Sequence, residues 1–454
     1  MNGEKLKIAY YGDDFTGSTD ALEFLNKSGI KTVLFIDVPN QAQISRYPGL
    51  QAIGIAGKSR TQSPSEMEET LFPVFEALKA LQPEHVHYKV CSTFDSSPSI
   101  GSIGKAIDIG MEVFASRILP LLVAAPVLGR YCLFGNLFAR MGIGSDGAIY
   151  RLDRHPSMSK HPVTPANESD LSLHLAQQTN KNIRLFSILE LHQYRDHQKP
   201  LSFNEGEIVL FDALEQKELA LIGEIIDQQV KENNPVFSVG SSGVEMALGA
   251  HWNLDNEFTW DLKPLTEPII VLSGSCSAVT SAQINYALNN GFVGIAIDTL
   301  SLASEVSVKG LTVTDDVVEA YAAQALGLLQ QGKHVLIHTS LGNDDPRVNA
   351  TDEVLEQNAV KKGETASLYG TLLGEIARKV VAKIAIQRIV VAGGDTSSYA
   401  ARAMGIEAVE MIAPLSPGAP ICKAYAPNSA IDTLELVFKG GQVGKEDFFL
   451  SASN

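Results

Sequence analysis

The first half of the chain alternates short apolar runs with amphipathic stretches. The runs are rich in Val, Ile and Phe and have the length of buried strands, while stretches such as 65–81 repeat apolar residues at helical spacing. Near-continuous apolar strands separated by helices are typical of a mostly parallel sheet with both faces covered. The runs read KIAYYG, KTVLFID, QAIGIAG, VHYKV, IRLFS, EIVLFDA and PVFSVG.

A second series of the same kind follows a stretch rich in Trp, Asp and Asn at 253–266. It reads PIIVLSGS, GFVGIAID, KHVLIHTS, RIVVAGGD and VEMIAP, with helical segments such as TASLYGTLLGEIARKVVAK between strands. A chain of 454 residues also exceeds what one hydrophobic core usually supports. We therefore predict an α/β protein of two lobes, each a mostly parallel sheet flanked by helices, with a ligand cleft between them and domains at 1–255 and 266–454.

The alternation loosens between about 135 and 165, where the segment RLDRHPSMSKHPVTP contains three prolines and little apolar periodicity. We predict a long ordered loop for this part of the chain. Its polar group Arg151, Asp153, Arg154 and His155 either covers a ligand or belongs to a packed surface loop.

Composition and charge narrow the class of protein. The chain is 45% apolar and 19% charged, as in globular proteins with a large core, and its formal net charge is −16. Without a long Lys/Arg run, this charge argues against nucleic acid or an anionic membrane as a partner. No apolar stretch reaches the length of a membrane span, and the N-terminus resembles no export signal. The four distant cysteines form no C-x-x-C pair, so we expect a cytoplasmic protein. A homo-oligomer is left open.

Two strand-to-helix turns of the second lobe have the features of an anion site. In RIVVAGGDTSSYAARAMG, Gly393 and Gly394 let the backbone approach a phosphate, and the following helix start supplies N–H donors. PIIVLSGSCSAVTSAQI repeats the arrangement with Ser273, Gly274 and Ser275, so that two such loops form a cradle for a polyphosphate. The alternative for each is an ordinary turn between strand and helix, since neither is a Walker loop or G-x-G-x-x-G.

A third turn of the second lobe, LVFKGGQVGKEDFF, places Lys439 and Gly440 after another strand. It either closes over a nucleotide or is a surface turn.

In the first lobe, KIAYYGDDFTGSTDAL places Asp13 and Asp14 at the carboxyl end of the first strand, followed by Thr16. Adjacent carboxylates are costly to bury unpaired, so they meet a solvated turn, a metal or a substrate. The motif is similar to D-x-D-x-T of haloacid-dehalogenase phosphatases, but Gly12 stands where the nucleophilic Asp is required.

Three cations follow neighbouring strands of the same lobe. Lys58 and Arg60 lie in GKSRTQSP, and Lys89 is the last residue but one of VHYKV, so we expect them at the sheet edge that carries Asp14. Such cations suit a carboxylate substrate, which Arg60 can hold bidentately, although each alone is also an ordinary surface residue. His85 and His87 share a strand face, but without a third ligand we interpret them as structural, and the metal ligands stay unknown.

In combination, these motifs resemble the four-carbon acid sugar kinase family. Its N-terminal sugar-acid-binding domain opens with D-D-x-T-G, and its C-terminal nucleotide-binding domain contains S-G-S-x-S and G-G-[DE]-T-S; all three occur here in the same order. The resemblance implies ATP-dependent phosphorylation of a hydroxyl of a small sugar acid. We expect ATP to contact Ser273, Gly274, Ser275, Gly393, Gly394, Asp395, Thr396 and Gly440. We expect the acid sugar to contact Asp13, Asp14, Thr16, Lys58, Arg60, Lys89 and Ser92.

The sequence departs from that family in one segment. Many members read K-I-D-S-T-L-R-G-N where this chain reads KVCSTFDSS, with Cys91 for the acid and Asp95 for the Arg. Loss of that cation argues against simple threonate or erythronate recognition. The segment resembles the branch that acts on 3-oxo acids such as 3-oxo-isoapionate, with 3-oxo-tetronate, threonate and erythronate as related candidates.

The resemblance implies in-line transfer of the γ-phosphoryl group, with Mg²⁺ bridging the phosphates and a first-lobe carboxylate, Asp14 by our choice, accepting the hydroxyl proton. A two-lobed binding protein without catalysis and a small-acid phosphatase are the competing classes. ATP consumption in the presence of a sugar acid separates both from a kinase.

Overall fold

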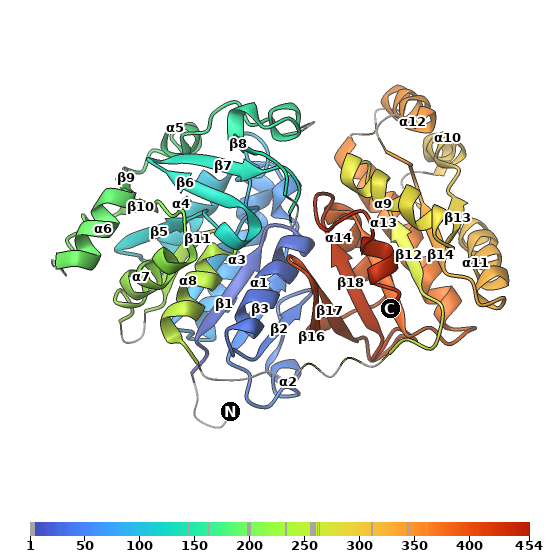
Figure 1. Cartoon of the computed structure of the whole chain (residues 1–454), viewed down its shortest axis with the longest axis horizontal. Helices are drawn as coiled ribbons and strands as arrows, with labels where there is room; N and C mark the ends of the chain where they lie inside the picture. The colour runs from blue at the N-terminus through green and yellow to red at the C-terminus, as the bar shows by residue number, and fades with distance from the viewer. Residues whose placement is uncertain are drawn as a thin grey trace. The chain divides into compact units, whose positions relative to one another are not determined.

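The computed structural model describes residues 5–143, 146–161, 163–197, 201–231, 234–254, 260, 262, 264–309, 312–342, 345–358, 360 and 362–454. The chain divides into two compact units, Met1–Thr259 (unit 1) and Trp260–Asn454 (unit 2), whose elements are labelled in Figure 1. The first and last predicted boundary residues of the N-terminal domain, 1 and 255, and part of the 253–266 stretch lie outside the described residues.

Unit 1 contains a sheet in which all neighbouring strands of the described part run parallel. The strands β1, β3, β4, β5, β10 and β11 are buried along their whole length, which explains their near-continuous apolar sequences. The sequence prediction of a mostly parallel sheet is confirmed here. In spatial order the strands are β2 (Thr32–Phe35), β3 (Ala52–Ala56), β1 (Ile8–Gly12), β4 (His85–Lys89), β11 (Val236–Gly240), β5 (Ile118–Leu122), β10 (Glu207–Phe211) and β9 (Ile183–Phe186).

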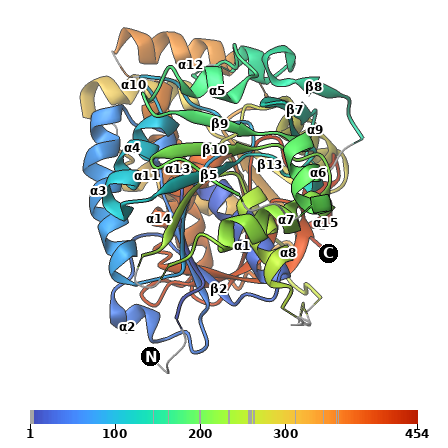
Figure 2. The ribbon, with the colours of Figure 1, turned by 90° about the vertical axis from the view of Figure 1, so that its left-hand side faces the viewer.

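Helices cover both faces of this sheet. Figure 2 shows α3 and α4 on one side of the strands and α7 and α8 on the other, and each pair packs together. Local signals set the helix starts: α3 begins with a capping box between Ser63 and Glu66, with Pro64 as its first residue. The helices are α1 (Phe15–Lys27), α2 (Gln41–Ile44), α3 (Pro64–Ala80), α4 (Ile103–Phe114), α5 (Leu171–Leu175), α6 (Ile188–His197), α7 (Gln216–Asp227) and α8 (Gly243–Trp252).

The predicted long loop between 135 and 165 is wrong in part. Strands β7 (Asn136–Arg140) and β8 (Ile149–Arg151) lie in this region and form a three-stranded antiparallel sheet with β6 (Arg130–Leu133), which precedes it. In β7 only Leu137 and Ala139 face inward, so the alternation is too short to distinguish from loop sequence. Residues 144, 145 and 162 of this region lie outside the described residues.

Unit 2 contains a mixed sheet. Strands β13 (Val293–Ala296), β14 (Val335–His338), β12 (Ile270–Ser273), β15 (Arg388–Ala392) and β18 (Glu435–Lys439) are parallel in this order. The strands β17 (Ala419–Tyr425) and β16 (Ala408–Ser416) extend it antiparallel. The predicted parallel series is confirmed for its first four members, PIIVLSGS, GFVGIAID, KHVLIHTS and RIVVAGGD, whereas VEMIAP belongs to the antiparallel pair.

The helices of unit 2 surround its parallel strands. The longest, α13, packs against α11 and α14, and α9 packs against α15. None of the helices in the described ranges has the length and apolar character required to cross a membrane. The helices are α9 (Ala278–Asn289), α10 (Thr299–Lys309), α11 (Asp315–Leu329), α12 (Pro346–Gln357), α13 (Lys362–Val381), α14 (Gly394–Ala403) and α15 (Phe448–Ser451).

Candidate functional site

Two adjacent carboxylates lie where β1 ends and α1 begins. Asp14 is the N-cap of α1, and its carboxylate accepts hydrogen bonds from the Gly17 N–H and the Thr16 hydroxyl, each at 2.8 Å. Asp13 and Asp14 are only 2% and 3% exposed. This burial excludes the solvated turn that the sequence left open for these two side chains.

Arg60 holds both carboxylates. Its Nη2 lies 2.7 Å from Asp13 Oδ1, its Nε donates to Asp13 Oδ2 at 3.2 Å, and its Nη1 donates to Asp14 Oδ2 at 2.9 Å. The parallel register aligns Gly12 with Ala56, so the turn after β3 delivers Arg60 beside the end of β1. The bidentate grip that we expected on a substrate is therefore made to Asp13.

Burial disfavours the charged form of both acids, but the balance differs between them. At Asp14 the charges of Arg60 and Lys89 and the bonds from Thr16 and Gly17 outweigh burial, and the pKa lies below its ordinary value. At Asp13 burial prevails over Arg60, and the neighbouring Asp14 charge acts in the same direction, so the pKa is raised. Of the two carboxyl groups, Asp14 therefore ionises more readily.

Lys89 lies on the other side of β1 and is 1% exposed. Its ammonium group donates to the Val90 carbonyl at 3.1 Å and lies 3.6 Å from Asp20 Oδ2. Although burial favours the neutral amine, the surrounding carboxylates, Asp20 first, raise the pKa of Lys89. A Cβ added at Gly17 would lie 3.1 Å from this ammonium group, so the helix backbone approaches it closely.

Asp20 is a site residue that the sequence analysis missed. It is 7% exposed, burial raises its pKa, and its Oδ1 is enclosed without a hydrogen-bond partner in the described part of the chain. Its signal in the sequence is an acidic residue on a helical stretch that is otherwise buried.

The segment after β4 completes the first site. Ser92 is buried and accepts a hydrogen bond from Arg130 Nε at 3.2 Å. Burial, together with the charge of Asp95, raises the pKa of Cys91 to about 12, so Cys91 is a neutral thiol and does not replace an acid. The exposed Lys58 forms no ion pair with the carboxylates in the described ranges.

The three predicted phosphate loops of unit 2 lie side by side. Strand register pairs Ser273 with Ala392 and Ala392 with Lys439, so the loops that follow begin at one level of the sheet edge. Gly274 N–H donates to the Ala392 carbonyl at 3.1 Å, and Gly393 N–H donates to the Lys439 carbonyl at 2.9 Å. Their adjacency is the arrangement that a polyphosphate cradle requires.

Glycine is required at two of these positions. A Cβ at Gly274 would lie 2.3 Å from Thr396 Oγ1, and Gly393 has a φ of 123°. Gly393 is also the N-cap of α14 without a side-chain acceptor, in contrast to Ser277, which caps α9. The first turn of α14 therefore presents backbone donors to an anion, with the exposed Asp395 beside them.

A fourth loop of the cradle was not predicted. Thr339 N–H donates to the Ser273 carbonyl at 3.0 Å, and the Ser340 hydroxyl contacts the Ser275 carbonyl at 3.4 Å. The small polar pair that ends KHVLIHTS is the signal, because it repeats the strand-to-small-residue pattern of SGS.

Lys439 is buried beneath the start of α9. Its ammonium group lies 3.0 Å from Thr280 Oγ1 and faces the rings of Phe448 and Phe449. Burial lowers the pKa of Lys439 to about 7, so this lysine carries only part of its charge near neutral pH.

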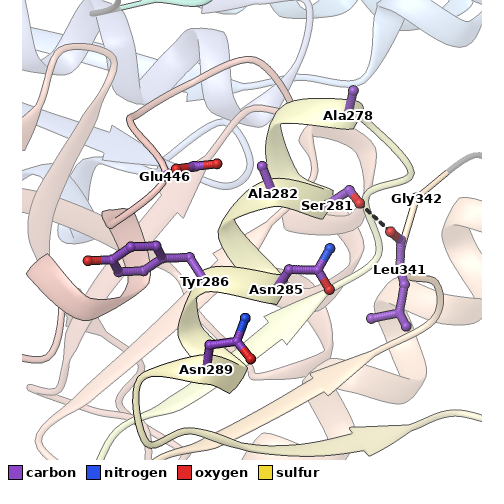
Figure 3. A pocket seen from close by; sticks show the side chains of 9 residues that line it. All are labelled: Ala278, Ser281, Ala282, Asn285, Tyr286, Asn289, Leu341, Gly342 and Glu446. Carbon is purple, nitrogen blue, oxygen red and sulfur yellow. Dashed lines mark hydrogen bonds between the residues drawn. The ribbon is translucent and has the colours of Figure 1, made fainter.

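A cavity of about 650 Å³ lies along α9, starting at Ala278 directly after the cap Ser277. Its size is that of a small-molecule pocket. Figure 3 shows the amides of Asn285 and Asn289 on the helix and the hydrogen bond from the Ser281 hydroxyl to the Leu341 carbonyl. The lining residues are Ala278, Ser281, Ala282, Asn285, Tyr286, Asn289, Leu341, Gly342 and Glu446.

The histidines of β4 have structural partners. His85 Nε2 lies 2.9 Å from Asp227, and His87 Nδ1 lies 2.5 Å from Glu245. Within the described ranges, His, Cys, Asp and Glu form no group of three that could hold a metal ion.

Two family models match the chain. A sugar-binding N-terminal domain matches residues 8–248, and a nucleotide-binding C-terminal domain matches residues 270–449. The first contains the Asp13, Asp14 and Arg60 cluster, and the second contains all four loops of the cradle.

Curated relatives and solved structures match over nearly the full chain. The 3-oxo-isoapionate kinase of Paraburkholderia graminis is 42% identical, with 98% of this chain and 93% of the relative covered. The 3-oxo-tetronate kinase of Pectobacterium atrosepticum is 29% identical, with 98% of each covered. A solved structure from Salmonella typhimurium LT2 has a TM-score of 0.73 at 25% identity, with 98% of each chain covered.

Replacing Arg60 by Met leaves two buried carboxylates without their cation. Removal of one partner of a buried ion pair costs about 3–5 kcal/mol, so we expect a loss of that size in the free energy of unfolding, measured in urea. Lys58→Met, two residues away on an exposed side chain, is the matched control and should change it by less than about 0.5 kcal/mol. A loss below about 1 kcal/mol for Arg60→Met would show that the carboxylates do not depend on this arginine.

Replacing Gly274 by Ala forces the Thr396 loop away, because the new Cβ would overlap the Thr396 hydroxyl. We expect nucleotide affinity, measured by calorimetry, to fall at least about tenfold, a loss of about 1.4 kcal/mol. Gly327→Ala in α11, where a Cβ meets nothing within 4 Å, is the control and should leave affinity unchanged. Equal affinity in both variants would place the phosphates elsewhere.

Proposed function

The chain belongs to the four-carbon acid sugar kinase family, in which a sugar-binding domain precedes a nucleotide-binding domain, and from this we propose that it transfers the γ-phosphoryl group of ATP to a hydroxyl of a small acid sugar. The observation that carries the proposal is the 42% identity to a 3-oxo-isoapionate kinase over 98% of the chain. The proposed substrate is 3-oxo-isoapionate or a related 3-oxo or four-carbon acid sugar, such as 3-oxo-tetronate, threonate or erythronate.

Unit 2 is proposed to bind ATP through backbone groups. The N–H donors at the start of α14 and the loops after β12, β14 and β18 hold the phosphates, and their fixed orientation stabilises the charge that develops during transfer. The cavity along α9 accommodates the nucleoside, because it begins one residue after the Ser277 cap. A phosphate close to the partly neutral Lys439 would favour its charged form.

Mg²⁺ is proposed to accompany ATP and, when bound, neutralises charge between the phosphates. The donors present fit an ion held mainly by phosphate oxygens and water, as Mg²⁺ often is, because Asp395 offers one exposed carboxylate in the first turn of α14.

Unit 1 is proposed to bind the acid sugar at the end of β1. Thr16 and the carboxylates of Asp13 and Asp14 can hydrogen-bond sugar hydroxyls, while Lys89 supplies buried positive charge. Asp14 is the proposed general base, since its lowered pKa keeps it ionised at neutral pH. The same lowered pKa makes it a weak base, so its contribution belongs at the lower end of the usual range.

Direct transfer requires the γ-phosphate to meet the sugar hydroxyl. We propose that the two units enclose both ligands in a cleft during the reaction, which would exclude water and limit ATP hydrolysis. None of the described cysteines forms a disulfide, which fits the cytoplasmic location that we propose.

A coupled ADP-release assay across four- and five-carbon aldonic and 3-oxo acids tests this function. We expect ADP release that depends on the acid, with the highest kcat/KM for 3-oxo-isoapionate. Acid binding without ADP release would instead indicate a binding protein, and phosphate release from a phosphorylated acid without nucleotide would indicate a phosphatase.

Asp14→Asn removes the proposed base and retains most of the side-chain volume. We expect kcat in the same assay to fall about 10²-fold or more, because general bases contribute about 10²–10⁴. Asp315→Asn, on an exposed carboxylate of unit 2, is the control and should leave kcat unchanged. Turnover of Asp14→Asn within about tenfold of wild type would exclude the base role.

A further inference from the structure

Arg130 is a buried cation with neutral partners. It is the first residue of β6 and is 4% exposed. Its Nη1 donates to the carbonyls of Leu128 at 2.9 Å and Arg140 at 3.1 Å, and its Nε donates to the Ser92 hydroxyl at 3.2 Å. These acceptors fix the plane of the guanidinium group without neutralising its charge.

Two other arginines of the described chain, Arg388 and Arg60, have carboxylate partners. Arg388 lies 2.7 Å from Glu435, and Arg60 lies 2.7 Å from Asp13. For Arg130, no carboxylate of the described residues lies within ion-pair distance, and Nη2 makes no hydrogen bond to them. A buried charge without a counter-ion is unfavourable, so a position of this kind is a candidate for binding an anionic ligand.

The surroundings of Arg130 place it at the first site. Ser92, which it contacts, lies three residues after Lys89 in the segment that follows β4. Cys91, Asp95 and Asp20 act on its charge from beyond ion-pair distance, and burial outweighs them, so the pKa of Arg130 is lowered.

Apart from the exposed Lys58, the other two cations of this site are already compensated. Arg60 is held by Asp13 and Asp14, and Lys89 lies beside Asp20. Of the three enclosed cations, Arg130 has the donor group and the uncompensated charge that a ligand carboxylate requires.

We propose that Nη2 of Arg130 binds the carboxylate of the acid sugar and so selects for acids over neutral sugars. This inference rests on the proposed function of the first site. The planar guanidinium group suits a carboxylate, which would supply the missing counter-charge. The opposite, hydroxyl-bearing part of the substrate then lies toward the carboxylates Asp13, Asp14 and Asp20, which accept hydrogen bonds from hydroxyls.

Arg130→Met tests the role, because Met keeps the length and removes the charge. In the ADP-release assay with 3-oxo-isoapionate, we expect KM to rise about 10²-fold while ATP affinity and kcat change by less than about threefold. Weak binding of the matching polyol, in which CH₂OH replaces the carboxylate, should be unchanged by the substitution. Arg184→Met is the control, since Arg184 of β9 pairs with Glu190 of α6, and the KM of this variant should equal that of wild type.

Equal weakening of acid and polyol binding would assign Arg130 a structural role and overturn the proposal. If Arg130→Met does not fold, Arg130→Lys provides the test, because it keeps the positive charge but lacks the planar guanidinium group. A raised KM with retained kcat supports the proposal, and an unchanged KM overturns it. If wild type releases no ADP with any acid, the proposed function fails, and calorimetric binding of the acid to wild type and variant still tests Arg130. Loss of acid binding in Arg130→Met alone would then support it, and equal binding would contradict it.

Discussion

The contact of Arg60 with Asp13 and Asp14 is the constraint on which the first site depends. Two adjacent carboxylates at 2% and 3% exposure cannot both be charged without a cation nearby. The parallel arrangement supplies it, because β3 ends beside β1 and the following turn carries Arg60. With Arg60 in place, Asp14 can cap α1 and remain ionised, and the helix start brings Gly17 close to Lys89. The same contact with Arg60 therefore stabilises the local fold at the end of β1 and the charge of the carboxylates.

The second site, in unit 2, is built mainly from backbone N–H donors and has almost no side-chain charge. Its loops approach one another so closely that Gly274 leaves no room for a Cβ beside Thr396, and α14 begins without a side-chain cap. The nearest buried cation, Lys439, is partly neutral. A site built from backbone donors favours an anion that brings its own counter-ion, whereas the first site, built from paired charges, favours a ligand that carries both hydroxyls and a carboxylate.

The sequence predicts the strand ends well, because apolar runs of five or so residues stop where the polar loops begin. For that reason the placement of Asp13, Asp14, Lys89 and the glycines at 274 and 393 at strand ends was predicted from the sequence. The sequence could not predict which acceptors each hydrogen-bond donor contacts. Arg60 was expected to bind the substrate, but the strand register places it against Asp13 and Asp14. Nor could the sequence identify Arg130, which lies 41 positions from Lys89 and reaches the site through a small antiparallel sheet whose alternation is too short to recognise.

The arrangement of charged residues in unit 1 would distinguish the carboxylate end of the proposed substrate from its hydroxyl end. Asp13, Asp14 and Asp20 surround Arg60 and Lys89, so the part of the site at β1 is rich in acceptors and repels a second carboxylate. Cys91 adds no negative charge, because burial and the charge of Asp95 raise its pKa and keep it a neutral thiol. An acid bound in the proposed way would direct its carboxylate away from this group and toward Arg130, the cation without a counter-ion among the described residues of this site. In the proposed reaction, this polarity would bring a hydroxyl, and not the acid group, against Asp14, the proposed base for phosphoryl transfer.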